Sequence, residues 1–110
     1  RDEGLNTRLE VVEAMGANPT EEWRNALRTA VVDPSAQVRA AAIRAIAKLP
    51  NGVKTEEIEN TLSDKHPWVQ LALLDIAENN GFKLPESTVK DLEQSTFPGI
   101  APRAAKLPRS

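Results

Sequence analysis

The apolar residues of this chain recur at helical spacing over most of its length. Between Leu5 and Met15 they lie three or four positions apart, which predicts one apolar face on a helix over residues 2–15. The same spacing from Trp23 to Val31 predicts a second helix. No stretch shows the sustained alternation of a β-strand, and the Ala-rich segments favour helix. The pattern therefore predicts an all-α fold.

Turn-forming residues separate the predicted helices. Gly16 is expected to end the first helix as a C-terminal cap. Asp33 is expected to cap a third helix, with Pro34 at its first position, where a missing N–H costs nothing. That helix extends to Leu49 and is apolar on two sides, which indicates that it packs between neighbours.

Further helical segments follow. Residues 55–62 form a short predicted helix, and a longer helix begins at Pro67 and ends in Asn-Asn-Gly at residues 79–81. Another short helix is expected at about residues 85–94. Beyond it two prolines and a glycine interrupt the pattern. We therefore interpret residues 96–110 as a degenerate half-repeat, which either caps the fold or links it to another domain.

The helices pair into a unit that repeats every 31 residues. Each unit begins with an aspartate, and an arginine or glutamine follows it six positions later; these pairs are Asp2 and Arg8, Asp33 and Arg39, and Asp64 and Gln70. A fixed period of two helices indicates a solenoid, in which each unit shares its core with its neighbours. We therefore predict one domain over residues 1–95, an α-α superhelix of about three antiparallel helix pairs.

The segments DPSAQVRAAAIRAI and DKHPWVQLALLDIA resemble HEAT-like repeats, particularly the short kind found in many bacterial proteins, including phycobilin-lyase-type subunits. The resemblance covers about residues 2–94. It implies that the aspartates and arginines above are structural, because in this family they form a ladder between adjacent repeats; together with Gln70 we call them the Asp–Arg ladder. The third unit has Gln70 in place of Arg and Ser95 in place of Asp, so we expect a weaker ladder there.

A repeat of this kind implies a non-catalytic protein–protein interaction scaffold, or an interaction domain of a larger protein. Its partner would bind on a concave surface lined by the second helix of each pair. The exposed positions of those helices that we predict to contact a partner are Arg44, Lys48, Trp68 and Asp75. One alternative is an accessory HEAT-like domain of a multi-domain bacterial enzyme or regulator, of the lyase type or the anti-sigma type. Another is a DNA-binding HEAT-like module.

Composition narrows these alternatives. The chain has 110 residues, no cysteine and a net charge of −2, and an acidic total without tyrosine argues against nucleic-acid binding. His66 is the only histidine, so we predict no catalytic pair, no metal site and no cofactor. We interpret His66 as an exposed helix cap.

The apolar runs are too short to span a membrane. The sequence does not determine the cellular compartment, although it slightly favours the cytoplasm. The first residue is Arg1 rather than Met, which suggests a part of a longer protein. Because the ends of a cut solenoid expose core residues, self-association through residues 2–15 is a further partner hypothesis.

Overall fold

The structure, a computed structural model, describes residues 3–108, and those residues contain six α-helices, three 3-10 helices and no β-strand. The all-α fold class is therefore confirmed. The α-helices are α1 (Glu3–Ala17), α2 (Arg24–Ala30), α3 (Ala36–Ala47), α4 (Pro67–Asn79), α5 (Glu86–Glu93) and α6 (Ile100–Ala105). The 3-10 helices are η1 (Glu21–Trp23), η2 (Thr55–Glu57) and η3 (Glu59–Thr61).

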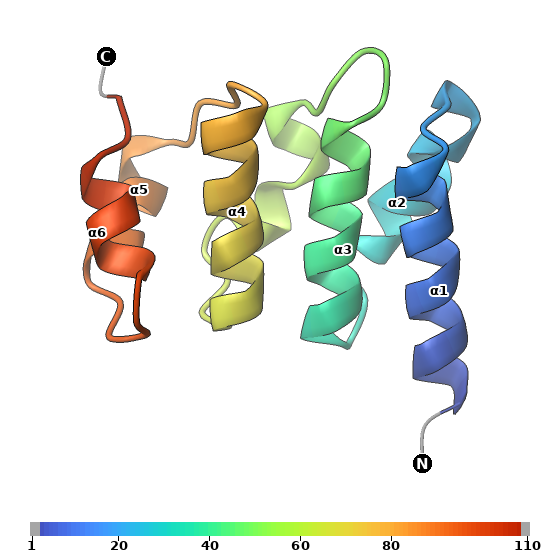
Figure 1. Ribbon diagram of the computed structural model, residues 1–110, viewed down its shortest axis with the longest axis horizontal. Coiled ribbons are helices and arrows are strands. Elements are labelled where there is room, and N and C mark those ends of the chain that lie inside the picture. Colours follow the sequence, from blue (N-terminus) through green and yellow to red (C-terminus); the bar gives the residue numbers. More distant parts are fainter. Residues whose placement is uncertain (1–2, 109–110) are drawn as a thin grey trace.

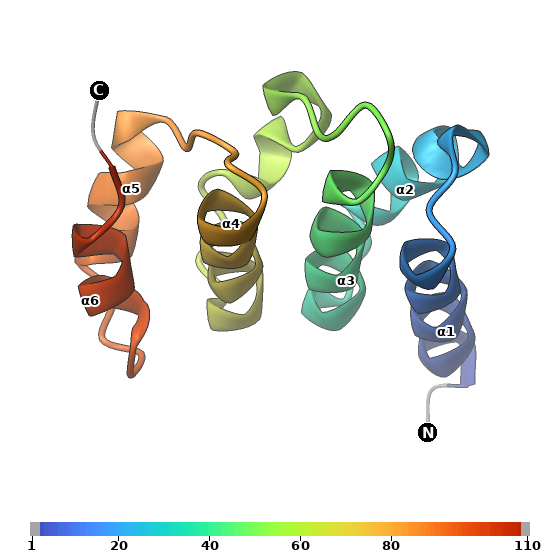
Figure 2. The same ribbon diagram turned by 45° about the horizontal axis from the view of Figure 1, so that its top comes forward.

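The helices form two layers. Helices α1, α3, α4 and α6 lie side by side in one layer, which we call the second-helix row, and α2, η2, η3 and α5 form the layer behind it (Figures 1 and 2). Three members of the row each follow a partner in the other layer along the chain, which gives the pairs α2/α3, η2–η3/α4 and α5/α6. This is the predicted arrangement of about three antiparallel helix pairs, with α1 preceding the first pair.

The core is centred on α3 and α4, the two middle helices of the row. On α3, Ala42, Ile43 and Ile46 have no exposed surface, because this helix contacts α1 on one side, α4 on the other and α2 behind it. On α4, Val69 and Leu73 are buried to the same extent. The apolar pattern on two sides of the third predicted helix therefore reflects its place between neighbours.

Gly16 lies inside α1 and does not end it, so the sequence expectation was wrong at this position. A Cβ atom added to Gly16 would lie 3.2 Å from the Cβ of Ala45 on α3. The missing side chain thus allows α1 and α3 to approach closely, and α1 continues to Ala17. Positive φ angles occur instead at Gly52 and Gly81, in the loops after α3 and α4.

The start of α3 also differs from the sequence expectation. The helix begins at Ala36, two positions after Pro34. Its N-cap is Ser35, whose hydroxyl accepts a hydrogen bond of 3.2 Å from the backbone N–H of Gln37. Asp33 therefore does not cap the helix, and its carboxylate is available for other contacts.

The predicted helix over residues 55–62 is replaced by the two 3-10 helices η2 and η3. Ile58 joins them with φ −121° and ψ 19°, outside the α-helical region, and its carbonyl accepts the N–H of Thr61 at 2.9 Å. The Ile58 side chain has no exposed surface. Burial of this residue in the core outweighs the local preference for a continuous α-helix.

The C-terminal segment packs as the second helix of the third pair. Helix α6 contacts α5 and α4, and Ile100 and Ala104 have no exposed surface. Leu107, just after the helix, is also buried. The division of the chain at residue 95 stays a prediction.

The close contact between α1 and α3 generates a prediction. Gly16→Leu should lower the free energy of unfolding by about 1–3 kcal/mol, because the added side chain would overlap Ala45. The matched control is Ala14→Leu, at an exposed position of the same helix, which should change it by less than about 0.5 kcal/mol. Urea unfolding followed by circular dichroism measures both, and equal midpoints would contradict the packing role.

Candidate interaction surface

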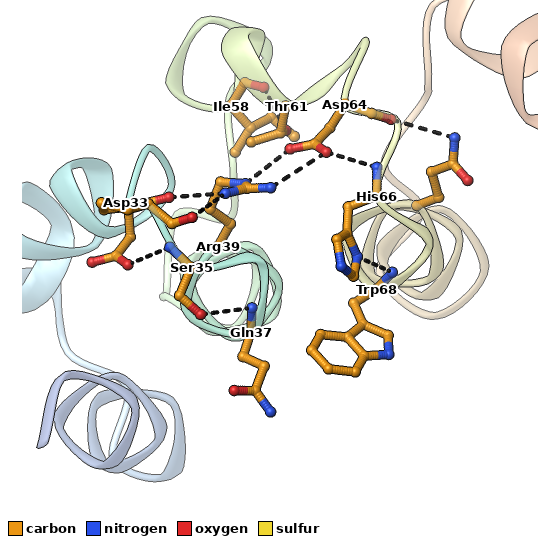
Figure 3. Close-up of polar contacts among 11 residues, drawn as sticks. Asp33, Ser35, Gln37, Arg39, Ile58, Thr61, Asp64, His66 and Trp68 are labelled. Atoms are coloured by element: carbon orange, nitrogen blue, oxygen red, sulfur yellow. Dashed lines mark hydrogen bonds and ion pairs between the residues drawn. The ribbon is translucent and has the colours of Figure 1, made fainter. Parts of the chain in front are cut away.

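The two ladder aspartates within the described residues lie in the turns that precede α3 and α4. The Asp33 carboxylate accepts a hydrogen bond of 2.8 Å from the backbone N–H of Ser35. The Asp64 carboxylate accepts one of 2.9 Å from the N–H of His66 (Figure 3). A carboxylate bonded to its own backbone two residues later stabilises a turn. Each aspartate therefore shapes the entry to a second helix.

The same carboxylates bind arginines from the preceding unit of the stack. Arg8 donates from Nε to Oδ1 of Asp33 at 2.8 Å, and Arg39 donates from Nε to Oδ2 of Asp64 at 2.9 Å. Both pairs join residues 25 positions apart. Arg39 also donates from Nη1 to the carbonyls of Asp33 and Pro34, at 3.0 and 3.1 Å. One guanidinium thus connects the turn before α3 to the turn before α4 (Figure 3).

The third unit makes a different contact. Gln70 is buried, and its Nε2 donates to the carbonyl of Asp64 at 3.3 Å, within its own unit. The Ser95 hydroxyl accepts the N–H of Phe97 at 3.1 Å. Over residues 3–108 no hydrogen bond joins Gln70 to Ser95. Asp2, the first ladder residue of the sequence prediction, lies outside the described residues.

The environment of Asp33 favours its ionised form. Burial raises the pKa of the Asp33 carboxyl, but hydrogen bonds from the Arg8 guanidinium and the Ser35 N–H outweigh burial, so the pKa lies below its ordinary value. The carboxylate is therefore a charged partner for Arg8 throughout the neutral range.

A second set of ion pairs crosses the second-helix row. Asp75 on α4 accepts from Arg44 on α3 at 2.7 Å and from Arg103 on α6 at 2.8 Å. Arg103 also binds Glu78, one turn further along α4, at 2.8 Å. We call these four residues the row cluster. Arg44 and Asp75, each predicted to contact a partner, therefore bind one another.

The charges of the row cluster reinforce each other. Burial opposes ionisation of Asp75, but hydrogen bonds from Arg103 and Arg44 outweigh it and hold the pKa of this carboxyl below its ordinary value. Hydrogen bonds to Glu78 and Asp75 raise the pKa of Arg103. With two cations and two anions, the cluster presents no net charge to a partner.

The other two predicted contact residues lie at opposite ends of the two middle helices, Lys48 at the C-terminal end of α3 and Trp68 at the N-terminal end of α4. Lys48 directly follows α3 and is exposed beside a groove of about 350 Å³ between α1 and α3. Trp68 lies in the first turn of α4 with 46% of its surface exposed. The backbone N–H of Trp68 donates to Nδ1 of His66, which confirms His66 as the helix cap, although that residue is half-buried. Gln37 on α3 extends toward the same side as Trp68 (Figure 3).

The sequence interpretation missed several charged residues. Arg24 binds Glu21 and the buried Glu57, both at 2.8 Å, in the layer behind the row. Its hydrogen bonds lower the pKa of Glu21 to about 2. Arg24 and Glu57 lie 33 positions apart, outside the 31-residue period, so no signal pointed to them. For Arg44 and Asp75 a signal existed, because they lie 31 positions apart with opposite charges.

The groove between α1 and α2, of about 260 Å³, has the exposed Val11 on its wall together with Met15 and Ala30. It lies at the N-terminal end of the stack. Self-association through this end stays a prediction.

Comparison with known proteins gives one match. A family model for HEAT repeats matches residues 1–78. No curated protein and no solved structure matches the chain. Within residues 3–108, no group of three or more His, Cys, Asp or Glu residues could hold a metal ion, and no helix is both long and apolar enough to cross a membrane.

The ladder generates a prediction about coupling. A double-mutant cycle with Arg39→Met and Asp64→Asn should give a coupling energy of about 1–2 kcal/mol, because both side chains are largely buried and several hydrogen bonds are lost together. The same cycle on Arg44 and Asp75, which are more exposed, should give less than about 1 kcal/mol. Urea unfolding measures both cycles, and a larger value for the second pair would contradict this ranking.

The lowered pKa of Asp33 predicts a loss of stability in acid. As the pH falls below about 3.9, the unfolded chain takes up a proton at Asp33 before the folded chain does, so the free energy of unfolding decreases. The Asp33→Asn and Arg8→Gln variants should each be less stable than the parent at neutral pH. In acid, the difference in the free energy of unfolding between each variant and the parent should become smaller. Unfolding midpoints between about pH 7 and pH 2 measure this, and variant curves parallel to the parent curve would contradict it.

Proposed function

Because the chain belongs to the HEAT repeat family, whose members are generally non-catalytic protein-interaction scaffolds, we propose that it binds a partner protein on the outer face of the second-helix row. The partner is either a separate protein or a neighbouring domain of the same chain. The observation that carries the proposal is the exposure of Trp68 in the first turn of α4.

Trp68 has the properties of an anchor for a protein partner. With 46% of its surface exposed, its indole offers a large apolar area to a partner. Tryptophan is among the residues that contribute most to binding energy when a partner buries them. The ring contact with His66, whose ring centre is 5.0 Å away, limits the motion of the indole before binding.

The polar residues of the row suit the rim of such an interface. The row cluster is partly exposed and internally neutralised, so it offers hydrogen-bond donors and acceptors without an unpaired charge. Lys48 makes no ion pair within residues 3–108 and supplies the one predicted contact with an uncompensated charge. Acidic groups on the partner near the C-terminal end of α3 would complement it.

The test begins by replacing Trp68 with the photoreactive residue benzoylphenylalanine, which should crosslink to the partner. The matched control carries the same residue in place of Lys90, which is exposed on α5 in the other layer. With the captured partner purified, Trp68→Ala should weaken binding in calorimetry by about 30-fold, and Lys90→Ala should leave it unchanged. Equal crosslinking from both positions would refute the proposal that the partner binds this surface. Unchanged affinity of the folded Trp68→Ala variant would refute it as well.

A further inference from the structure

The surface is hollowed where the third arginine–aspartate pair of the ladder is missing. A groove of about 530 Å³ lies between the start of α4, the end of α5 and the loop that leads to α6. Gln70 and Ser95, which replace the ladder residues, are on its wall, together with Asp91 and Phe97. The first ladder pair, Arg8 and Asp33, borders a smaller groove of about 260 Å³, and there an arginine side chain occupies the position that Gln70 holds in the third unit.

The contacts of Arg39 show which hydrogen-bond acceptors surround a guanidinium at the equivalent position of the second unit. It binds the carboxylate of Asp64 and the carbonyls of Asp33 and Pro34. One period later these positions hold the side chain of Ser95 and the carbonyls of Asp64 and Lys65. Gln70 is shorter than arginine and donates only to the Asp64 carbonyl. Most of the acceptors that served the guanidinium in the second unit are therefore not used by Gln70.

The groove also has the charge and the apolar walls that an arginine side chain requires. Among the residues that the structure describes, only Lys65 binds the Asp91 carboxylate; the distance is 3.5 Å and both side chains are well exposed, so the pair is weak. The charged residues on the wall are Asp91 and Lys65, and a guanidinium in the groove competes with the Lys65 ammonium for the Asp91 carboxylate. Phe97, with 41% of its surface exposed, offers a ring face on which a planar guanidinium can stack. Pro67 and Pro98 can cover the aliphatic part of the chain.

We propose that this groove binds an arginine side chain of a partner polypeptide, whose guanidinium takes the place of the arginine that the third unit lacks. The guanidinium donates to the carboxylate of Asp91, the hydroxyl of Ser95 and the carbonyl of Lys65, and it displaces the Lys65 ammonium from Asp91. An arginine fits better than a lysine, because its fork of donors reaches several acceptors at once. The proposal does not depend on the row surface around Trp68.

The first experiment uses N-acetyl-arginine methylamide as the probe, titrated into the ¹⁵N-labelled protein and followed by NMR. The side-chain amide of Gln70 and the backbone amide of Phe97 should shift and saturate at millimolar probe concentrations. The neutral citrulline analogue has nearly the same shape, and it and the lysine analogue should bind at least about tenfold more weakly. Equal binding of arginine and citrulline analogues, or shifts that spare these two amides, would overturn the proposal.

Variants then locate the site. Asp91→Asn should weaken binding of the arginine probe about tenfold, and Glu56→Gln, at an exposed carboxylate on η2, should leave it unchanged. The double variant Gln70→Arg with Ser95→Asp should rebuild the third ladder pair, abolish probe binding and raise the unfolding midpoint. Unchanged affinity in Asp91→Asn would overturn the proposal even if the double variant does not fold, and so would probe binding by a folded double variant.

Discussion

Small side chains between neighbouring helices set the spacing on which the other contacts depend. Gly16 and Ala45 allow α1 to lie close against α3. At that separation the side chain of Arg8 spans the distance to Asp33 with hydrogen bonds of good length. A wider separation would weaken both the apolar contact and the ion pair, so the ladder depends on the packing. The ladder in turn aligns the turns before α3 and α4, from which the residues of the row extend.

The repeat period explains why so much of this fold could be predicted and where prediction failed. Positions one period apart have equivalent surroundings, so the pattern around Asp33 also described Asp64. Local signals were less reliable. Gly16 is typical of a helix end but serves close packing, and residues 55–61 favour an α-helix but bend around the buried Ile58. In these cases contacts distant in sequence decide the structure, and no pattern within one segment reports them.

The charged residues of the candidate site show the same limit. Arg44 and Asp75 were expected to face a partner because they occupy outward positions of their helices, and each binds the other. In the interface that we propose, this pair would supply polarity and hydrogen bonding with little net attraction. Arg103 belongs to the same cluster, but it lies in a segment where the repeat pattern is interrupted. Its contact with Asp75 could therefore not be predicted without knowing where α6 packs. Trp68 is exposed, and its contact with a partner stays a prediction.

The Asp–Arg ladder lacks its third ion pair, and this affects how firmly the last helix pair is held in the stack. The pair α5/α6 is joined to α4 by Arg103 on the face of the row, and at the turns it lacks the ion pair that connects the earlier units. Near those turns the ion pair of Lys65 with Asp91 is long, at 3.5 Å, and well exposed, so this unit is held less firmly there and should rotate about the edge at Arg103 more easily than the earlier units. Such rotation would change the curvature of the superhelix between α4 and α6 and would vary the width of the groove beside Gln70. Of the three helix pairs, we therefore expect α5/α6 to move most easily relative to its neighbours.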